Sequence, residues 1–133
     1  GSAAQTTGFV DTDFPLFRAA DAYLMLAECA ARGAADNAKG LAALNAVRER
    51  AGVATLSSFT AQDVLDERGR ELLWEGHRRS DLIRFGKFTT ADYLWEYKGS
   101  VKEGVAVADY RNLFPLPPAD VNANSNLKQN AGY

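Results

Sequence analysis

The sequence predicts an all-α fold in which a helical hairpin and further helices are joined to long irregular loops and an extended C-terminal tail. Apolar residues recur at helical spacing in two stretches before residue 52. A densely charged stretch from Asp63 to Lys87 keeps this spacing, and after it the pattern breaks up among glycines, prolines and asparagines. At 133 residues the chain is long enough for one hydrophobic core, so we expect a single domain over 1–133.

The first two stretches predict an antiparallel pair of helices. We expect the first helix to open at Asp13 and Pro15 and to end at Gly33. The second should run from a cap at Asp36 to Gly52. The apolar stripes of the two helices comprise Leu16, Ala20, Tyr23, Leu24, Leu26, Ala27 and Ala30, and then Leu41, Leu44, Val47 and Ala51. Because the connection is short, we expect a hairpin of the tetratricopeptide type.

The charged stretch predicts a third helix, a corner and a short fourth helix. Thr60 can cap the third helix, and Gly76 should weaken it near its end. Ser80 or Asp81 can then cap the next helix. Trp74 follows two leucines within the third helix, which predicts that its side chain belongs to the core.

The charges at this corner, on Glu71, Glu75, Arg78 and Asp81, have two interpretations. Two carboxylates one helical turn apart could be imagined as the pair of a glycoside hydrolase. Yet each carboxylate has a basic neighbour, so ion pairing explains the pattern better than acid–base chemistry, and we predict no catalytic residue. The four residues should instead form a partly buried ionic lock, in which Arg78→Ala or Asp81→Ala costs on the order of 3 kcal/mol of stability.

Residues 88–109 form a variable loop region without helical periodicity, and loops of this length in a compact domain usually have a function. The candidate ligand contacts are its aromatic residues Phe88, Tyr93, Trp95 and Tyr97. Aromatic faces on loops suit sugar rings or another protein, although such rings also fill the underside of their own loop. Beyond them, the prolines around Leu116 predict an extended segment, followed by an asparagine-rich tail on the surface.

Composition and charge argue against several classes of protein. Fifteen basic and seventeen acidic residues give a net charge of −2, which does not suit nucleic-acid binding. His77 has no second histidine or cysteine at ligand spacing, so we expect no metal and no cofactor. The single cysteine, Cys29, lies in an apolar helical pattern that predicts a small buried side chain. No apolar run approaches the roughly 20 residues of a membrane span, and residues 1–13 should be a flexible lead-in that begins with a cloning remnant, Gly1-Ser2.

Five blocks of the sequence match a family pattern in the right order. They are LFRAADAYLMLAE at 16–28, LNAVRERAG at 44–52, ERGRELLWEGHRRSDLIRFG at 67–86, FPLP at 114–117 and QNAGY at 129–133. Together they resemble the C-terminal region of the SusD/RagB family of nutrient-binding outer-membrane lipoproteins. The departures are small: Asp21 for glutamate, Phe85 for tryptophan, and Ser125 and Ala131 where proline is usual.

The resemblance implies a non-enzymatic protein that binds a glycan or another nutrient at the outer cell surface and delivers it to a SusC-type TonB-dependent transporter. It implies attachment to the outer membrane through a lipidated cysteine that this chain lacks, so the chain would be a fragment or an unusually short relative. Ligand contacts in the family lie in variable loops, which leaves the aromatic residues of 88–97 as candidates. Two alternatives remain: a helical protein-interaction scaffold without its own ligand site, and a glycoside hydrolase that uses Glu71 and Glu75.

Overall fold

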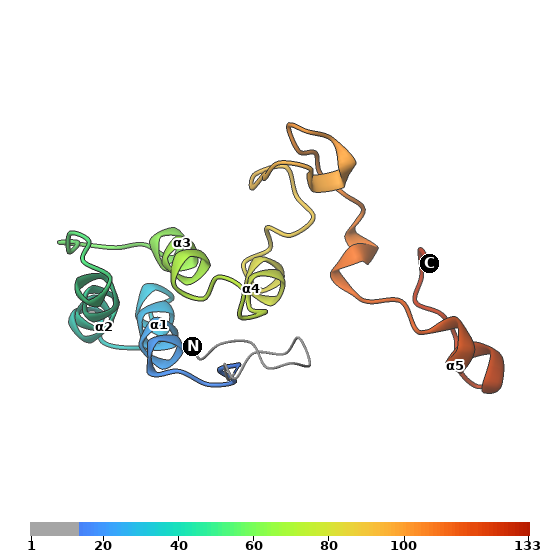
Figure 1. Cartoon of the computed structure of the whole chain (residues 1–133), viewed down its shortest axis with the longest axis horizontal. Coiled ribbons are helices and arrows are strands. Elements are labelled where there is room, and N and C mark those ends of the chain that lie inside the picture. Colours follow the sequence, from blue (N-terminus) through green and yellow to red (C-terminus); the bar gives the residue numbers. More distant parts are fainter. Residues whose placement is uncertain (1–13) are drawn as a thin grey trace, which may run out of the picture. The chain divides into compact units, whose positions relative to one another are not determined.

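The regular secondary structure of the protein is entirely helical in the part of the chain that the computed structural model describes, residues 14–133, and long irregular segments follow the fourth helix (Figure 1). These residues contain no strand. Their helices are α1 (Ala19–Ala31), α2 (Asn37–Arg50), α3 (Ala61–Glu71), α4 (Arg78–Arg84), the 3-10 helices η1 (Lys98–Ser100) and η2 (Asp109–Asn112), and α5 (Pro118–Ala123). The predicted all-α fold is therefore confirmed, whereas the lead-in and cloning remnant expected over 1–13 lie outside the described residues.

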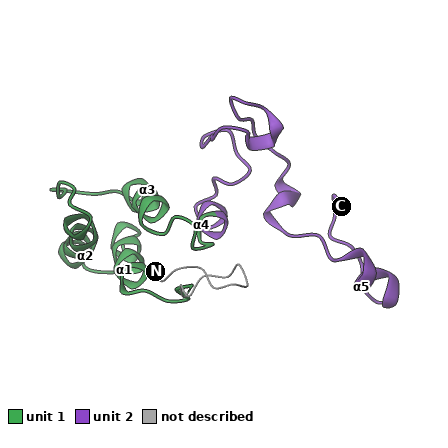
Figure 2. Ribbon diagram, in the orientation of Figure 1, with its two compact units in different colours: residues 1–78 green, residues 79–133 purple. Residues whose placement is uncertain are grey.

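The chain divides into two compact units, residues 1–78 and residues 79–133, which we call unit 1 and unit 2 (Figure 2). Unit 1 contains α1, α2 and α3, and unit 2 contains the two 3-10 helices, α5 and nearly all of α4. Of the eleven buried apolar side chains among the described residues, ten belong to unit 1 and only Leu82 belongs to unit 2. The single domain expected over 1–133 stays a prediction.

α1 and α2 form the expected helical hairpin of the tetratricopeptide type, and α3 packs against α1. Asp36 caps α2 as predicted, because its carboxylate accepts a hydrogen bond from the amide of Lys39 at 2.9 Å. The two helices approach closely at a glycine: a Cβ built on Gly40 would lie 2.3 Å from the Cβ of Ala30. The core of unit 1 comprises Ala20, Leu24, Ala27, Leu44, Val47, Val64 and Leu72.

Two expectations for the first helix are wrong. The backbone of Arg18 is extended (φ −132°, ψ 148°), so α1 begins at Ala19 and not around Pro15. The side chain of Arg18 instead extends to Glu71 and Glu75 of unit 1. Cys29 is exposed rather than buried. It lies five residues after the fully buried Leu24, which turns it about 140° around the helix from that side chain.

Thr60 caps α3 as predicted, in a reciprocal capping box with Asp63. The hydroxyl of Thr60 accepts a hydrogen bond from the amide of Asp63, and the carboxylate of Asp63 accepts one from the amide of Thr60 at 2.7 Å. These contacts hold the pKa of Asp63 below its usual value, the largest contribution coming from the Thr60 side chain. The start of α3 is thus determined by residues three positions apart.

The corner after α3 differs from the sequence prediction. α3 ends at Glu71, where the chain turns before it reaches Gly76. The turn takes Trp74 off the helix: its backbone is left-handed (φ 67°) and the residue is 90% exposed, so its predicted place in the core is wrong. α4 begins at Arg78, which places Asp81 in its first turn rather than at a cap.

The 88–109 region of unit 2 folds back on itself through backbone hydrogen bonds. The amide of Val107 donates to the carbonyl of Thr89 at 2.9 Å, and the amide of Val105 donates to the carbonyl of Lys98 at 3.0 Å. These bonds bring the two ends of the region together. The long irregular loops predicted here are therefore confirmed.

The C-terminal tail of unit 2 lies along the extended segment at 113–117. The side-chain amide of Gln129 bonds both the amide and the carbonyl of Leu116, each at 2.8 Å. The hydroxyl of Tyr133 donates to the carbonyl of Leu113 at 2.8 Å. The extended tail is confirmed, and it is attached mainly through bonds from polar side chains to backbone groups.

Candidate functional site

Unit 2 contains a cleft of about 570 Å³. The aromatic residues that line it are Phe88, Trp95, Tyr97, Tyr110, Phe114 and Tyr133. Three of the four aromatic residues predicted as ligand contacts therefore meet in one cleft. The fourth, Tyr93, is not among its lining residues, and the ring of Tyr93 lies 6.0 Å from the ammonium of Lys87. A ligand-binding role for these four residues stays a prediction.

Sequence reasoning did not select three of the rings that line the cleft. Tyr110 lies in η2, Phe114 in the extended segment and Tyr133 at the end of the tail. Tyr133 reaches the cleft because its hydrogen bond to the carbonyl of Leu113 folds the tail back. A signal for two of them existed in the sequence, since Phe114 and Tyr133 belong to the FPLP and QNAGY blocks.

The rings of the cleft form two pairs with different geometries. Phe88 and Trp95 are stacked, with ring centroids 6.1 Å apart and an interplanar angle of 28°. Tyr110 and Tyr133 meet edge to face at 4.8 Å. Tyr97 is 66% exposed, so its ring remains open to a ligand.

Arg79, in α4, connects the two sides of the cleft. Its guanidinium carbon lies 3.8 Å from the ring centroid of Phe114 and 4.9 Å from that of Phe88. The cation thus contacts one ring of the extended segment and one ring of the 88–109 region. The same guanidinium donates hydrogen bonds to the carbonyl of Arg111 at 2.8 Å and to that of Asn112 at 3.2 Å. Arg79 therefore holds η2 and the extended segment near Phe88.

Lys98 holds the other wall of the cleft from within. The residue is 2% exposed. Its ammonium lies 2.5 Å from the carbonyl oxygen of Thr90, 2.8 Å from that of Tyr93 and 3.2 Å from that of Lys87. The ammonium also lies 4.6 Å from the ring centroid of Trp95. Burial lowers the pKa of Lys98 below its usual value, and Asp92 opposes this effect only in part.

The cleft offers rings and hydrogen-bond donors rather than acid–base groups. Its charged lining residues are Arg79, Lys98 and Arg111, and no aspartate or glutamate lines it. In the described part of the chain, no three histidine, cysteine or acidic side chains gather as a metal site. Across the same residues, no helix has the length and apolar character needed to cross a membrane. The lining of the cleft thus presents aromatic rings and cationic donors, and it does not include the carboxylate pair of a glycosidase.

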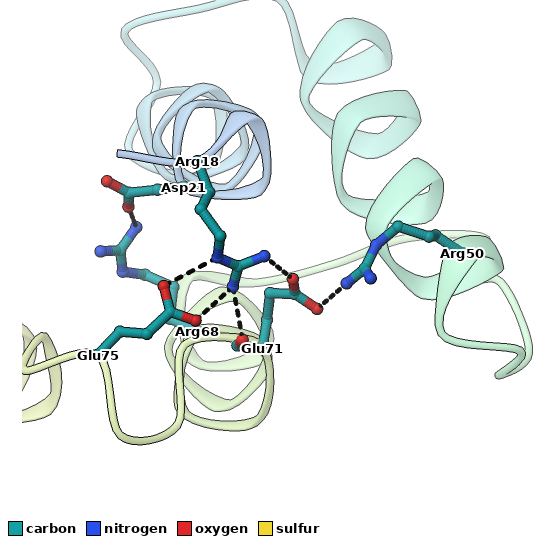
Figure 3. A network of polar contacts seen from close by, with 6 residues as sticks. All are labelled: Arg18, Asp21, Arg50, Arg68, Glu71 and Glu75. Carbon is teal, nitrogen blue, oxygen red and sulfur yellow. Dashed lines mark hydrogen bonds and ion pairs between the residues drawn. The ribbon is translucent and has the colours of Figure 1, made fainter. Parts of the chain in front are cut away.

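The glutamates considered for catalysis form an ionic network in unit 1 (Figure 3). Arg18 donates to the carboxylate of Glu71 at 2.8 Å, to both oxygens of Glu75 at 2.8 and 2.7 Å, and to the carbonyl of Glu71 at 2.8 Å. Arg50 also pairs with Glu71. Beside this network, Arg68 and Asp21 form a buried ion pair at 2.7 Å.

This network fits a structural role better than a catalytic one. Its hydrogen bonds hold the pKa of Glu75 below its usual value, with the side chain of Arg18 as the largest cause. A general acid of a glycosidase needs the opposite shift. The same bonds, first those to Glu75 and then those to Glu71, raise the pKa of Arg18.

The four residues of the predicted ionic lock bond several different partners in the structure. Glu71 and Glu75 share Arg18, which the sequence analysis did not consider as their partner. Arg78 donates to the carbonyl of Leu65 at 2.8 Å within unit 1. In unit 2, Asp81 pairs with Arg84, three residues later, at 2.7 Å. A single lock made from all four residues stays a prediction.

The family model and the curated relatives that match this chain indicate the same family. Residues 2–133 match the SusD family. The starch-binding protein SusD of Bacteroides thetaiotaomicron is 44% identical over 134 residues, which cover 100% of this chain and 24% of that protein. The chain thus spans about a quarter of the length of this curated relative.

Solved structures support the same relationship. Surface glycan-binding protein A from Bacteroides uniformis matches with a TM-score of 0.75 and 30% identity, over 89% of this chain and 27% of that one. Surface glycan-binding protein A from Bacteroides thetaiotaomicron matches with a TM-score of 0.75 and 28% identity, over 89% of this chain and 24% of that one. Each match therefore concerns about a quarter of a longer protein.

Proposed function

The chain belongs to the SusD family, and from this we propose that it is part of a non-enzymatic protein that binds a glycan at the outer cell surface. The relatives support this ligand class, since one is named as a starch-binding protein and two are named as surface glycan-binding proteins. We assign the glycan to the cleft of unit 2, because this cleft presents several aromatic rings together.

The observation that carries the assignment is the grouping of exposed rings from distant segments. A pyranose ring has an apolar face of C–H groups that stacks on an aromatic ring, while its hydroxyl groups need hydrogen-bond partners. The ring of Tyr97 is open to solvent on one segment, and that of Phe114 is open on another. Arg111 supplies an exposed donor between them in the sequence. This combination suits an oligosaccharide better than a wholly apolar ligand.

We further propose that the whole protein delivers its glycan to a SusC-type TonB-dependent transporter. Resemblance to the SusD/RagB family supports this partner, as it supports attachment to the extracellular face of the outer membrane through a lipid anchor. Co-purification of the longer protein with a SusC-type transporter from the same organism would test the partnership. Loss of glycan uptake on deletion of the gene would test the delivery.

Titration of the chain with a panel of oligosaccharides tests the binding proposal. The panel should include malto-oligosaccharides, because of the similarity to a starch-binding protein, together with other neutral and acidic oligomers. We expect one class to give heat by calorimetry and a change in tryptophan fluorescence. Trp95→Ala should weaken binding at least tenfold, equal to about 1.4 kcal/mol, whereas Trp74→Phe, at a residue that does not line the cleft, should bind as the wild type does.

A competing function has its own support in unit 1. Phe17 is 91% exposed, and Leu73 and Trp74 are also exposed, which suits a scaffold that binds another protein. If a folded chain shows no response to any oligosaccharide at millimolar concentration, direct binding in the cleft is rejected and the scaffold is favoured. If a glycoside is cleaved, and cleavage disappears in Glu71→Gln, both are rejected in favour of a hydrolase.

A further inference from the structure

The three carbonyl oxygens around the Lys98 ammonium come from one short segment, at Lys87, Thr90 and Tyr93. A lysine ammonium has three N–H donors, so these carbonyls match its full donor set. Carbonyl oxygens that point at one spot repel one another unless a donor or a cation lies between them. The conformation of residues 87–93 therefore depends on what occupies that spot.

Burying the ammonium of Lys98 carries a desolvation cost. Moving an ammonium out of water is unfavourable, and its hydrogen bonds offset this only in part, in agreement with the lowered pKa of Lys98. Asp92, the carboxylate whose charge acts on Lys98, forms its own ion pair with Lys87 at 3.6 Å. A buried charged group can still favour one backbone conformation over others, even where its burial is unfavourable.

The backbone on either side of Lys98 is bent to turn its side chain inward. Tyr97 and Ser100 are both left-handed (φ 63° and 65°), which is unfavourable for residues with a side chain. Gly99 is left-handed as well, and a Cβ there would lie 2.6 Å from the Cγ2 of Val105. This strained turn needs contacts that offset its cost, and the buried lysine supplies three of them beside backbone hydrogen bonds such as that from Val105 to Lys98.

We propose that Lys98 is the positioning residue of the cleft: its ammonium gathers three carbonyls and thereby imposes the single loop conformation that presents Trp95 and Tyr97 to a ligand. The role in ligand binding rests on the function proposed above. The role in loop conformation does not depend on any ligand. Lys98 acts through the rings and need not contact the glycan.

The loop conformation can be tested through Trp95 alone. The chain has two tryptophans, so Trp74→Phe leaves Trp95 as the single indole in an NMR spectrum. We expect one sharp indole N–H resonance in this background. Adding Lys98→Met should replace it with several or broadened resonances, while the helical circular dichroism of unit 1 and the midpoint of unfolding change little. Lys102→Met, an exposed lysine of the same region, should keep the single resonance.

The ligand arm of the experiment separates this inference from the proposed function. Lys98→Met should weaken glycan binding at least tenfold, and Lys102→Met should leave it unchanged. A wild type that binds no glycan would overturn the proposed function alone, because the resonance of Trp95 still decides the role of Lys98. An unchanged resonance in Lys98→Met, or unchanged affinity in that variant, would overturn the inference about Lys98.

Chemical rescue distinguishes the N–H donors of Lys98 from the shape of its side chain. Lys98→Cys, in a background of Cys29→Ser and Trp74→Phe, can be alkylated in urea with 2-bromoethylamine and refolded, which rebuilds an ammonium with the length of lysine. Alkylation with (2-bromoethyl)trimethylammonium gives a similar charge without N–H donors. Only the first product should restore the single Trp95 resonance, and its failure to do so would contradict the proposal.

Discussion

Unit 1 and unit 2 are stabilised by different interactions, although they belong to one short chain. Unit 1 buries ten apolar side chains between three helices and adds ion pairs such as Arg68–Asp21. Unit 2 buries only Leu82 among its apolar residues and is held by cationic and polar side chains that bond backbone carbonyls. Lys98 and Arg79 provide five such bonds between them.

The difference indicates which unit can vary in sequence without loss of the fold. Helical packing of unit 1 depends on small and apolar residues at regular spacing, and many hydrophobic exchanges preserve it. A loop held by single polar side chains, as in unit 2, changes its shape when one of them is replaced. Unit 1 therefore depends mainly on apolar packing, whereas the cleft of unit 2, which we assign to the ligand, depends on individual polar side chains.

The strongest test of this comparison is to remove Arg18, which connects the start of α1 to two glutamates. Arg18→Met leaves the mostly buried carboxylates of Glu71 and Glu75 without this cation, and Glu71 then retains Arg50. We expect the free energy of unfolding to fall by about 3 kcal/mol, measured by urea denaturation followed by circular dichroism. Equal stability in the variant would mean that the contacts of Arg18 add nothing to the apolar packing and the other ion pairs of unit 1.

Arg70→Met is the matched control for Arg18. Arg70 is 60% exposed on its side chain, and its partner Glu67 keeps a second ion pair with Arg48 at 2.6 Å, so the cost should stay below about 1 kcal/mol.

The effect of Arg18 should also depend on pH. Because the folded-state pKa of Glu75 lies below its usual 4.5, this contribution is fully present above pH 4.5 and disappears as the pH falls through the folded-state value. The stability difference between wild type and Arg18→Met should therefore narrow in acid.

Much of unit 1 could be predicted from the sequence because its signals are local. Asp36 and Thr60 cap their helices through contacts three residues away, and the apolar periodicity marks the buried face. The start of α1 could not be predicted, because Arg18 is extended and its side chain bonds Glu71 and Glu75, which lie more than fifty positions later in the sequence. Trp74 was misplaced for a related reason, since the helix ends earlier than its apolar pattern suggests.

The cleft could be predicted only in part. Phe88, Trp95 and Tyr97 stood out as aromatic residues in an irregular region, and the structure brings them together. The opposite wall could not be predicted, because the tail returns through bonds such as that between Gln129 and Leu116, which no periodicity reveals. Lys98 was overlooked because a lysine in a loop is usually exposed.

Gly40→Ala tests the apolar side of the comparison, with an intermediate effect. Alanine favours a helix over glycine by about 1 kcal/mol, yet the new Cβ would lie 2.3 Å from the Cβ of Ala30 and 3.1 Å from the ring of Phe59. Since the Cβ of Ala30 cannot rotate away, α1 and α2 must separate, and we expect a net loss of about 2 kcal/mol in thermal or urea unfolding. In Gly69→Ala the nearest atom is the movable guanidinium of Arg78 at 2.9 Å, so that control should change stability by less than about 1 kcal/mol.

Trp74→Gly should have the smallest effect and the opposite sign. The left-handed backbone of Trp74 is unfavourable for a tryptophan, its side chain is 90% exposed, and glycine adopts φ 67° without strain. The free energy of unfolding should therefore rise by about 1 kcal/mol. Leu73→Gly, an exposed neighbour outside the left-handed region, should instead lose about 0.5–1 kcal/mol. A loss of about 3 kcal/mol or more in Trp74→Gly would contradict this prediction. A loss of that size is typical of removing a buried aromatic side chain, so it would indicate that Trp74 packs in the core after all.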